Sequence, residues 1–462
     1  MKLIDITKGA DKANVIPLLK KHRNKPEVDV EKALKAIDPL RHDVMDETIR
    51  KKKEVSTDTG TKFEEVARIA LAFQKLIINH AVSFCFGNEV NQDCIINNDT
   101  DRQAFEAYKN VLKDNKSKSL NRKIARALFT FSEVAEYWYT VETEKGEGIG
   151  VDKNKKIRVS LLTPDKNKLY PYFDETGKMI AFSREYQVIE NDEKVSYFET
   201  WTDEDYTLMD LEGNIKDNGY KVHGLGKIPI VFLSQDDRET ADIDKLVDRL
   251  ETTLSNFADN VDYHSAPITV VNGPIRSFLK KGEQGGILEV DTDVKPYYLE
   301  WSQAPEATRT EVETLTSLIY TLTQTPDISF DNMKNIGSVA EMTLRLMFMD
   351  AHLKVQDKCE IFDDSLQRRA SIIKNYLGTL LDGEIAIAAK KMAISQEITP
   401  YMYGDTASEI NNLLSANGNK PLISHKQSVI KAALTPDPAA DYEQILTEGA
   451  EDSYTDITEP TI

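Results

Sequence analysis

Apolar residues in the first part of the chain recur mainly at helical spacing. The first such stretch opens at Thr61, which has Glu64 three residues later as in a capping box, and it runs to Gly87. Helical patterns resume over about 101–114 and 118–133. Three helices are therefore predicted before the pattern changes.

From Val134 to Phe232 the pattern becomes one of β-branched and aromatic residues interleaved with charged ones. Turn sequences at 174–177 and 212–214 divide this stretch into short segments. These features predict an antiparallel meander with helices on one face. The fold class expected from the sequence is therefore α+β.

The first 54 residues are rich in charge and end in the basic run Arg50–Lys53. This composition favours a loosely ordered arm with one or two short helices. A contact between subunits and a solvated leader without a role are both open for it.

A helix is predicted from Thr240 to His264, and its apolar residues are spaced seven apart. Such spacing gives a narrow seam that packs on neighbouring helices. The seam consists of Ile243, Val247, Leu250, Leu254, Phe257 and Val261. The other faces are expected to meet water through Asp248, Glu251, Asp259 and Asp262.

Residues 265–304 are strand-like, and a second helix is predicted from Pro305 to Pro326. The expected arrangement is a hairpin of two helices with a small β insert between their tips. After a loop, Ser338 and Glu341 have capping-box spacing and begin the longest helical pattern, which continues to about Leu381. That helix would span roughly 65 Å, so a kink or a path across the surface is expected.

The last 80 residues are predicted to hold two short helices that begin at Thr406 and Ser424. Prolines at 436 and 438 follow, and the chain then becomes strongly acidic. Such acidic ends are usually mobile and solvated.

The overall charge limits which partners the chain can hold tightly. With 58 Lys and Arg against 77 Asp and Glu, the net charge is -19. Tight, sequence-independent binding to DNA requires an excess of basic residues, so it is not expected of this chain. DNA could still pass nearby without being held. No apolar run reaches the length of a membrane span, and no export signal is evident, so no membrane partner is expected.

No catalytic, metal or cofactor site is predicted. Gly226-Lys227 suggests a phosphate loop, but position 221 is Lys rather than Gly, and Ile228-Pro229 leads into a strand instead of a helix. The seven histidines form no metal-binding pair, and the three cysteines form no CxxC motif. A reduced, intracellular setting fits this cysteine usage.

Three motifs in order resemble those of portal proteins from tailed double-stranded DNA bacteriophages, in the branch known from long-tailed phages of Gram-positive hosts. The first is the strand 226–232 followed by Asp236 and Asp237, and the second is the loop 330–340 with its Gly-Ser before a long helix. The third runs from Asn417-Gly418 through Leu422-Ile423-Ser424 to Leu434, Asp437, Asp441 and Glu443.

The resemblance implies a ring, commonly of twelve subunits, around a central channel. In its terms the chain divides into an N-terminal arm (1–54), wing (55–237), first stem helix (238–264), clip (265–304), second stem helix (305–326), tunnel loop (327–338), long wing helix (339–385), and a helical crown with an acidic tail (386–462). The channel-lining residues implied for the tunnel loop are Asp331, Asn332, Met333, Lys334, Asn335, Ile336 and Gly337.

The resemblance also implies a function without catalysis. The ring would sit at one capsid vertex, conduct double-stranded DNA during packaging and ejection, and dock the terminase large subunit and the neck and tail proteins. Major capsid and scaffold proteins would be further partners. The subunit would be found in the virion, and in the host cytoplasm during assembly.

Two other functions remain open from the residues alone. One is another oligomeric capsid or head–tail adaptor protein, which would form no closed ring with a hole wide enough for a duplex. The other is a nucleotide-dependent enzyme that uses the Gly226-Lys227 region, whose binding would be lost in Lys227→Ala.

Overall fold

The computed structural model describes residues 12–23, 26–57, 60–149, 154–264, 269–270, 297–298, 304–327, 346, 348–401, 406–418, 422–432, 434–435 and 438–455. They group into two compact units. The first contains the chain up to residue 328 together with Asp350–Tyr401, and the second contains Ser329–Met349 and Met402–Ile462.

Two sheets form the body of the first unit, and all their strand pairs are antiparallel, as the alternating pattern predicted. The three-stranded sheet has the order β11-β4-β5 and contains β4 (Glu133–Glu142), β5 (Lys155–Leu162) and β11 (Ile230–Ser234). The five-stranded sheet has the order β10-β9-β8-β7-β6 and contains β6 (Asn167–Phe173), β7 (Met179–Glu190), β8 (Glu193–Trp201), β9 (Asp205–Asp210) and β10 (Ile215–Val222).

Helices α5 (Asp99–Asp114) and α6 (Ser117–Phe131) confirm the two predicted helical stretches before the sheets. Both are amphipathic, and α6 buries Leu120, Ile124 and Leu128 on the side that faces the core. The mixed helix-and-strand fold class expected from the sequence is therefore present.

The helix predicted to begin at Thr61 is wrong at its start. Residues there form the hairpin of β1 (Lys53–Thr57) and β2 (Gly60–Glu64), and α4 begins only at Phe73 (Phe73–Phe86). Gly60 has φ +134°, which suits the tight connection between the strands. Residues 65–72 are extended, because alternate backbone N–H groups there bond to side chains of a distant helix.

The N-terminal segment is more ordered than the expected loose arm. It contains α2 (Lys12–Lys21), α3 (Val30–Ile37) and the 3-10 turns η1 (Pro39–Arg41) and η2 (Asp43–Met45). Leu19 of α2 is completely buried and packs with Tyr170 and Phe198 of the five-stranded sheet. An apolar side of α2 thus covers this sheet. The charge-rich composition of the segment gave no indication of this packing.

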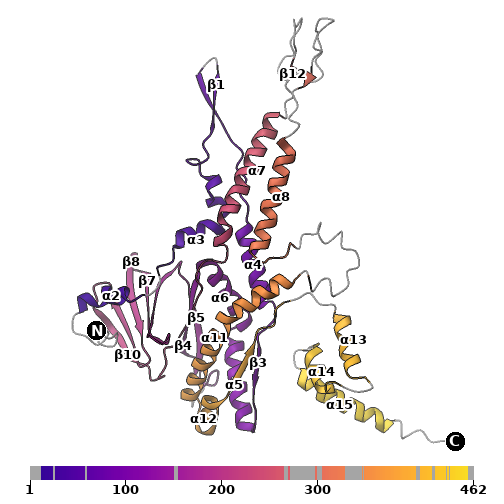
Figure 1. The fold of residues 1–462 in the computed structure, drawn as a ribbon. Helices are drawn as coiled ribbons and strands as arrows, with labels where there is room; N and C mark the ends of the chain where they lie inside the picture. The colour runs from indigo at the N-terminus through magenta and orange to yellow at the C-terminus, as the bar shows by residue number, and fades with distance from the viewer. Residues whose placement is uncertain are drawn as a thin grey trace, which may run out of the picture. The chain divides into compact units, whose positions relative to one another are not determined.

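The predicted helical hairpin is confirmed in α7 (Asp244–His264), which follows the 3-10 turn η3 (Ala241–Ile243), and in α8 (Ala304–Leu322). Figure 1 shows the two helices side by side. In the insert between them the structure describes β12 (Thr269–Val270) and β13 (Tyr297–Tyr298), which pair antiparallel. The other residues predicted as strands in 265–304 lie outside the described part of the chain.

The long helix is α11 (Met349–Leu380), and it is continuous over 32 residues. Its predicted start at Ser338 lies outside the described residues. Instead of crossing the surface, α11 runs through the first unit and buries Phe362, Leu366, Ile373 and Leu377.

Residues 386–401 were placed in the C-terminal crown segment by the sequence, but they belong to the first unit. They include most of α12 (Gly383–Lys391), which contacts α5, and the strand β14 (Ile394–Glu397). Strand β14 pairs antiparallel with β3 (Asn91–Cys94), about 300 residues earlier, so no local pattern indicated it.

The second unit contains the two predicted short helices, α13 (Thr406–Ala416) and α14 (His425–Ala432). Ser424 caps α14, since its Oγ accepts a bond from the backbone N of Gln427 at 3.2 Å. Residues 438–455, within the expected acidic tail, form helix α15 (Pro438–Thr455). The helix begins with proline at its first position, which favours helix initiation, and it carries apolar residues such as Ile445 and Leu446. The acidic composition alone did not indicate it.

Candidate functional site

The α7–α8 hairpin is held by apolar packing inside one subunit. Ile243, Val247 and Leu250 of the predicted seam are buried, in one cluster with Ile77 of α4 and Ile319 of α8. This part of the seam therefore faces helices of its own chain.

The rest of the seam becomes progressively more exposed toward the end of α7. Leu254 packs at the border of the same cluster, and Phe257 is half-buried. Val261 is 44% exposed. Of the six seam residues, Val261 is thus the one whose side chain is most available to a second subunit.

The acidic face of α7 does not simply meet water. Glu251, only 1% exposed, accepts the backbone N–H of Leu71 at 2.7 Å, and Asp259 accepts that of Ala67 at 2.6 Å. Between them Ser255 accepts the N–H of Ile69 at 2.9 Å. Three side chains of α7 thus bind the extended segment 65–72, which satisfies the backbone groups that a helix or sheet would otherwise have paired.

His42 forms a second clamp on α7. Its Nδ1 lies 2.6 Å from Glu251 Oε1, its Nε2 lies 3.3 Å from the carbonyl oxygen of Ala36, and both side chains are buried. Burial opposes the charged ring, but the hydrogen bond and negative charge of Glu251 outweigh it, so the pKa of His42 is raised above 6.5.

Arg50, from the predicted basic run, is the third clamp. It donates to Asn256 Oδ1 at 2.8 Å, to Asp259 Oδ2 at 2.5 Å and to the carbonyl oxygen of Ala67 at 2.8 Å. The guanidinium therefore ties the N-terminal segment, the extended segment and α7 together. Its fork of donors suits such a three-way contact better than a lysine would.

At its base the hairpin is joined to α11 by buried ions. Lys354 donates to the carbonyl oxygen of Thr323, just after α8, at 2.8 Å, and it pairs with Glu239 at 2.7 Å. Glu239 precedes α7 and also pairs with Lys358 at 3.0 Å. One carboxylate and two lysines thus link both ends of the hairpin to α11, with the positive charge placed where the α8 dipole is negative.

His42, Arg50, Glu239 and Lys354 were not predicted as site residues from the sequence. The partners of His42 and Arg50 on α7 lie more than 200 residues away, so the spacing of these contacts carries no local signal. The basic run was visible in the sequence, but nothing in it distinguished Arg50 from its lysine neighbours.

The predicted tunnel-loop residues Asp331–Gly337 lie outside the described residues, so no contact is assigned to them. Thr323 and Lys354, which bond to each other as above, are described residues on either side of that segment.

Lys227 lies at a strand entry, as its sequence predicted. Gly226 before it has φ +64°, and β11 follows from Ile230. The ammonium donates to Ser371 Oγ on α11, and burial, with Arg368 and Lys374 nearby, lowers the pKa of Lys227. The lysine therefore joins the sheet to the long helix.

Within the described residues, no cluster of His, Cys, Asp and Glu is arranged to hold a metal ion. None of the helices in that part of the chain combines the length and the apolar character that a membrane crossing requires.

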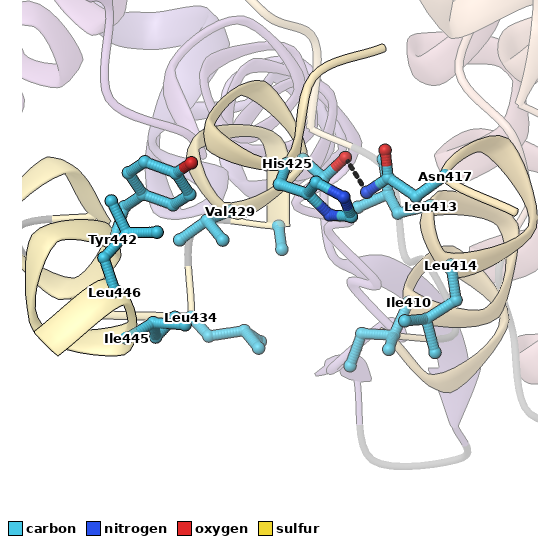
Figure 2. A pocket seen from close by; sticks show the side chains of 12 residues that line it. Ile410, Leu413, Leu414, Asn417, His425, Val429, Leu434, Tyr442, Ile445 and Leu446 are labelled. Atoms are coloured by element: carbon cyan, nitrogen blue, oxygen red, sulfur yellow. Dashed lines mark hydrogen bonds between the residues drawn. The ribbon is translucent and has the colours of Figure 1, made fainter. Parts of the chain in front are cut away.

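The second unit has an apolar groove between α13, α14 and α15 (Figure 2). It encloses about 350 Å³. Its lining comprises Ile410, Leu413, Leu414, Asn417, His425, Ser428, Val429, Ala432, Leu434, Tyr442, Ile445 and Leu446. The lining is mostly aliphatic, and its amide Asn417 Nδ2 is already bonded to Ser428 Oγ at 2.5 Å.

The family model described as "Phage portal protein, SPP1 Gp6-like" matches residues 24–454. The chain therefore belongs to this family of phage portal proteins, and it is a portal subunit, a structural component of the virion. The expectation drawn from the three sequence motifs is confirmed.

Solved structures similar to the chain include chains from gene transfer agent (GTA) particles. A chain titled "Virion of native gene transfer agent (GTA) particle" is 12% identical, with 93% of this chain and 100% of that chain covered and a TM-score of 0.43. A chain from the "Neck of empty GTA particle computed with C6 symmetry" is 12% identical, with 79% and 90% covered and a TM-score of 0.39.

A third, from the "Neck of native GTA particle computed with C12 symmetry", is 12% identical, with 79% and 89% covered and a TM-score of 0.37. Among curated proteins, no relative matches the sequence. The family assignment therefore rests on the match over residues 24–454.

Proposed function

We propose that the chain assembles into a closed ring of about twelve copies, in which the α7–α8 hairpins form the stem around a DNA channel. The observation that carries this proposal is a hairpin clamped along α7 by His42, Glu251 and Arg50 in a member of the portal family. A rigid rod of this kind can keep a constant angle to its neighbours in every copy, which closure of a ring requires.

The two hairpin helices are acidic, with eight Asp and Glu residues against three Lys and Arg residues in α7 and α8. Some of these carboxylates are used inside the subunit, as Glu251 is, whereas Asp248 and Glu306 are exposed. A duplex passing such a surface gains nothing from counterion release, so it slides without being held.

In this proposal the bounds of the wing and of the crown are changed from the sequence-based division to match the two structural units. The wing is the two-sheet body with α11 and α12, the stem is 238–264 with 305–326, and the clip is 265–304. The tunnel loop is 327–338, and the crown begins after Tyr401, where the second unit resumes. Residues 12–54 pack on the wing and stem.

The partners proposed are the other copies in the ring, the terminase large subunit at the clip, major capsid and scaffold proteins around the wing, and neck proteins after packaging. Double-stranded DNA passes without sequence preference. Assembly takes place in the host cytoplasm.

The proposal is tested by the mass and shape of the purified full-length chain, by mass photometry and negative-stain electron microscopy. Rings with a central hole wide enough for a duplex are expected, alone or after addition of the scaffold protein. A compact dimer or tetramer without a channel under both conditions would contradict it.

The tunnel-loop assignment has its own test. Replacing residues Asn332–Gly337 by a Gly-Ser segment of equal length is expected to leave ring formation unchanged and to reduce DNA packaging, and Lys334→Ala should have a smaller effect of the same sign. Full packaging by the Gly-Ser variant would remove this assignment.

A further inference from the structure

The helices of the C-terminal segment, α13, α14 and α15, have almost no core of their own. Between residues 406 and 455, no described apolar side chain is buried, and the buried side chain found there is that of Ser428. Leu414, Ile445 and Leu446 are between 47% and 64% exposed, although they line the groove of Figure 2.

A helical segment this small cannot be stabilised without burying apolar surface. Below about 70–80 residues a single hydrophobic core rarely supplies enough stability, and natural proteins of that size add disulfides, metals or association with another chain. The segment contains no cysteine, and the described residues offer no metal cluster. Burial of the apolar groove by another part of the assembly would supply the apolar contact that the described residues of the segment lack.

The same segment carries a side chain that matches the groove. Leu422 is 85% exposed, the largest exposure among the large apolar residues described. It lies between α13 and α14, and its backbone N donates to the carbonyl oxygen of Ala416 at 2.8 Å, which fixes the loop at that point. Leu422 does not line the groove of its own copy.

We propose that Leu422 of each copy inserts into the α13–α14–α15 groove of the next copy around the ring. The inference rests on the ring of the proposed function and adds a defined contact to it. A projecting side chain and a separate groove on one chain form a heterologous contact, which repeats from copy to copy and leaves no end when the ring closes.

A second copy fits these observations better than an unrelated protein does. A foreign segment in the groove would leave Leu422 in water, whereas the contact between copies removes both apolar surfaces from solvent. The groove volume of about 350 Å³ is ample for a leucine side chain, and its aliphatic lining from three helices suits that side chain.

Disulfide trapping in the full-length chain tests the contact. The background carries Cys94→Ser and Cys359→Ser, because these thiols are partly exposed, whereas Cys85 is buried and can stay. Leu422→Cys and Leu414→Cys are introduced into separate chains, which are mixed, assembled, checked for rings by electron microscopy and mildly oxidised. A matched control pairs Leu422→Cys with Gln427→Cys, which is exposed but not part of the groove.

Covalent dimers are expected from the Leu422/Leu414 mixture. A double variant, with Leu422→Cys and Leu414→Cys in the same chain, is expected to give a ladder of higher oligomers. The control pair should give neither. Rings that give no such cross-links would overturn this inference and leave the proposed ring intact. A cross-link confined to single chains of the double variant would also overturn it. Absence of rings in the starting protein would overturn the proposed function and this contact with it.

Discussion

Arg369 on α11 and Glu136 on β4 form a bidentate ion pair in the centre of the first unit. Nε and Nη2 of the guanidinium lie 2.9 and 2.7 Å from the two carboxylate oxygens, and the side chains are 3% and 0% exposed. Glu136 also accepts from Trp138 Nε1 at 2.9 Å, and Arg369 donates to Asn121 Oδ1 at 2.7 Å. The long helix, the three-stranded sheet and α6 thus share one buried network.

Removing one member of this pair should be costly. Arg369→Met leaves the Glu136 carboxylate buried without its cation, and a loss of about 3–5 kcal/mol in the free energy of unfolding is expected. Urea unfolding, followed by tryptophan fluorescence, measures the change, since Trp138 lies in the network.

The double variant Arg369→Met with Glu136→Met is the control, because replacing both charges by apolar side chains is often nearly neutral. It should recover most of the stability lost in Arg369→Met. A single variant within about 1 kcal/mol of the parent would show that the buried pair contributes little.

The His42–Glu251 clamp makes the stability of the stem depend on pH. The folded-state pKa of His42 is raised above 6.5, so protonation contributes stability that is fully present below pH 6.5 and is lost as the pH rises through the raised pKa. Hydrogen exchange of residues 36–50 and of α7 should therefore become faster between about pH 6 and pH 9, after correction for the intrinsic rate.

His42→Gln isolates this contribution, because the acidic neighbours Asp248 and Glu251 remain in place. The variant should exchange faster than the parent at pH 6, and the difference between the two should shrink toward pH 9. Equal differences at both pH values would mean that the charge on His42 does not stabilise the clamp.

Local patterns predicted the elements whose stability is local. Helices α5, α6, α7 and α8 and the antiparallel strands follow their periodicity, because each has an apolar face that the spacing shows directly. The helix predicted from periodicity over 65–72 does not form. The conformation of this segment is fixed instead by Glu251, Ser255 and Asp259 of α7, nearly 200 residues later. The capping-box spacing at Thr61 was satisfied by chance in a β-hairpin.

In two further segments, the high content of charged residues led to the wrong expectation about packing. The basic N-terminal segment and the acidic α15 both looked solvated, yet Leu19 is buried and α15 forms one wall of an apolar groove. A few apolar residues decide whether such a segment packs on its neighbours, and the average composition of the segment does not show them. The family, in contrast, was visible from motif order alone, because spacing along the chain survives when individual contacts cannot be foreseen.

The junction at the base of the hairpin gives a third prediction. In Lys354→Met, the carbonyl oxygen of Thr323 loses the charged donor and keeps the Thr325 hydroxyl, which donates to it at 3.2 Å, and Glu239 keeps only Lys358 among its described ion pairs. A loss of about 2–4 kcal/mol in unfolding free energy is expected, with faster hydrogen exchange at Ile319–Thr325. Lys358→Met, at the more exposed side of the same carboxylate, should cost clearly less. Equal costs would place the main support of the junction elsewhere.

The seam of α7 distinguishes folding of the subunit from assembly of the ring. Leu250 is 1% exposed inside the subunit, whereas Val261 is 44% exposed. Leu250→Asp buries a charge without a partner and should destabilise the subunit itself by several kcal/mol, about 3–5, so that soluble protein is lost before assembly. Val261→Asp should leave the unfolding free energy within about 0.5 kcal/mol of the parent, because surface substitutions cost little.

If the outer part of the seam packs between neighbouring stems, Val261→Asp should nevertheless lower the fraction of rings, as measured by mass photometry at equal protein concentration. Val261→Thr, of similar shape and without charge, is the matched control and should assemble nearly as the parent does. Normal ring formation by Val261→Asp would confine the seam to the interior of each subunit, and contacts between copies would then have to come from surfaces other than the α7 stripe.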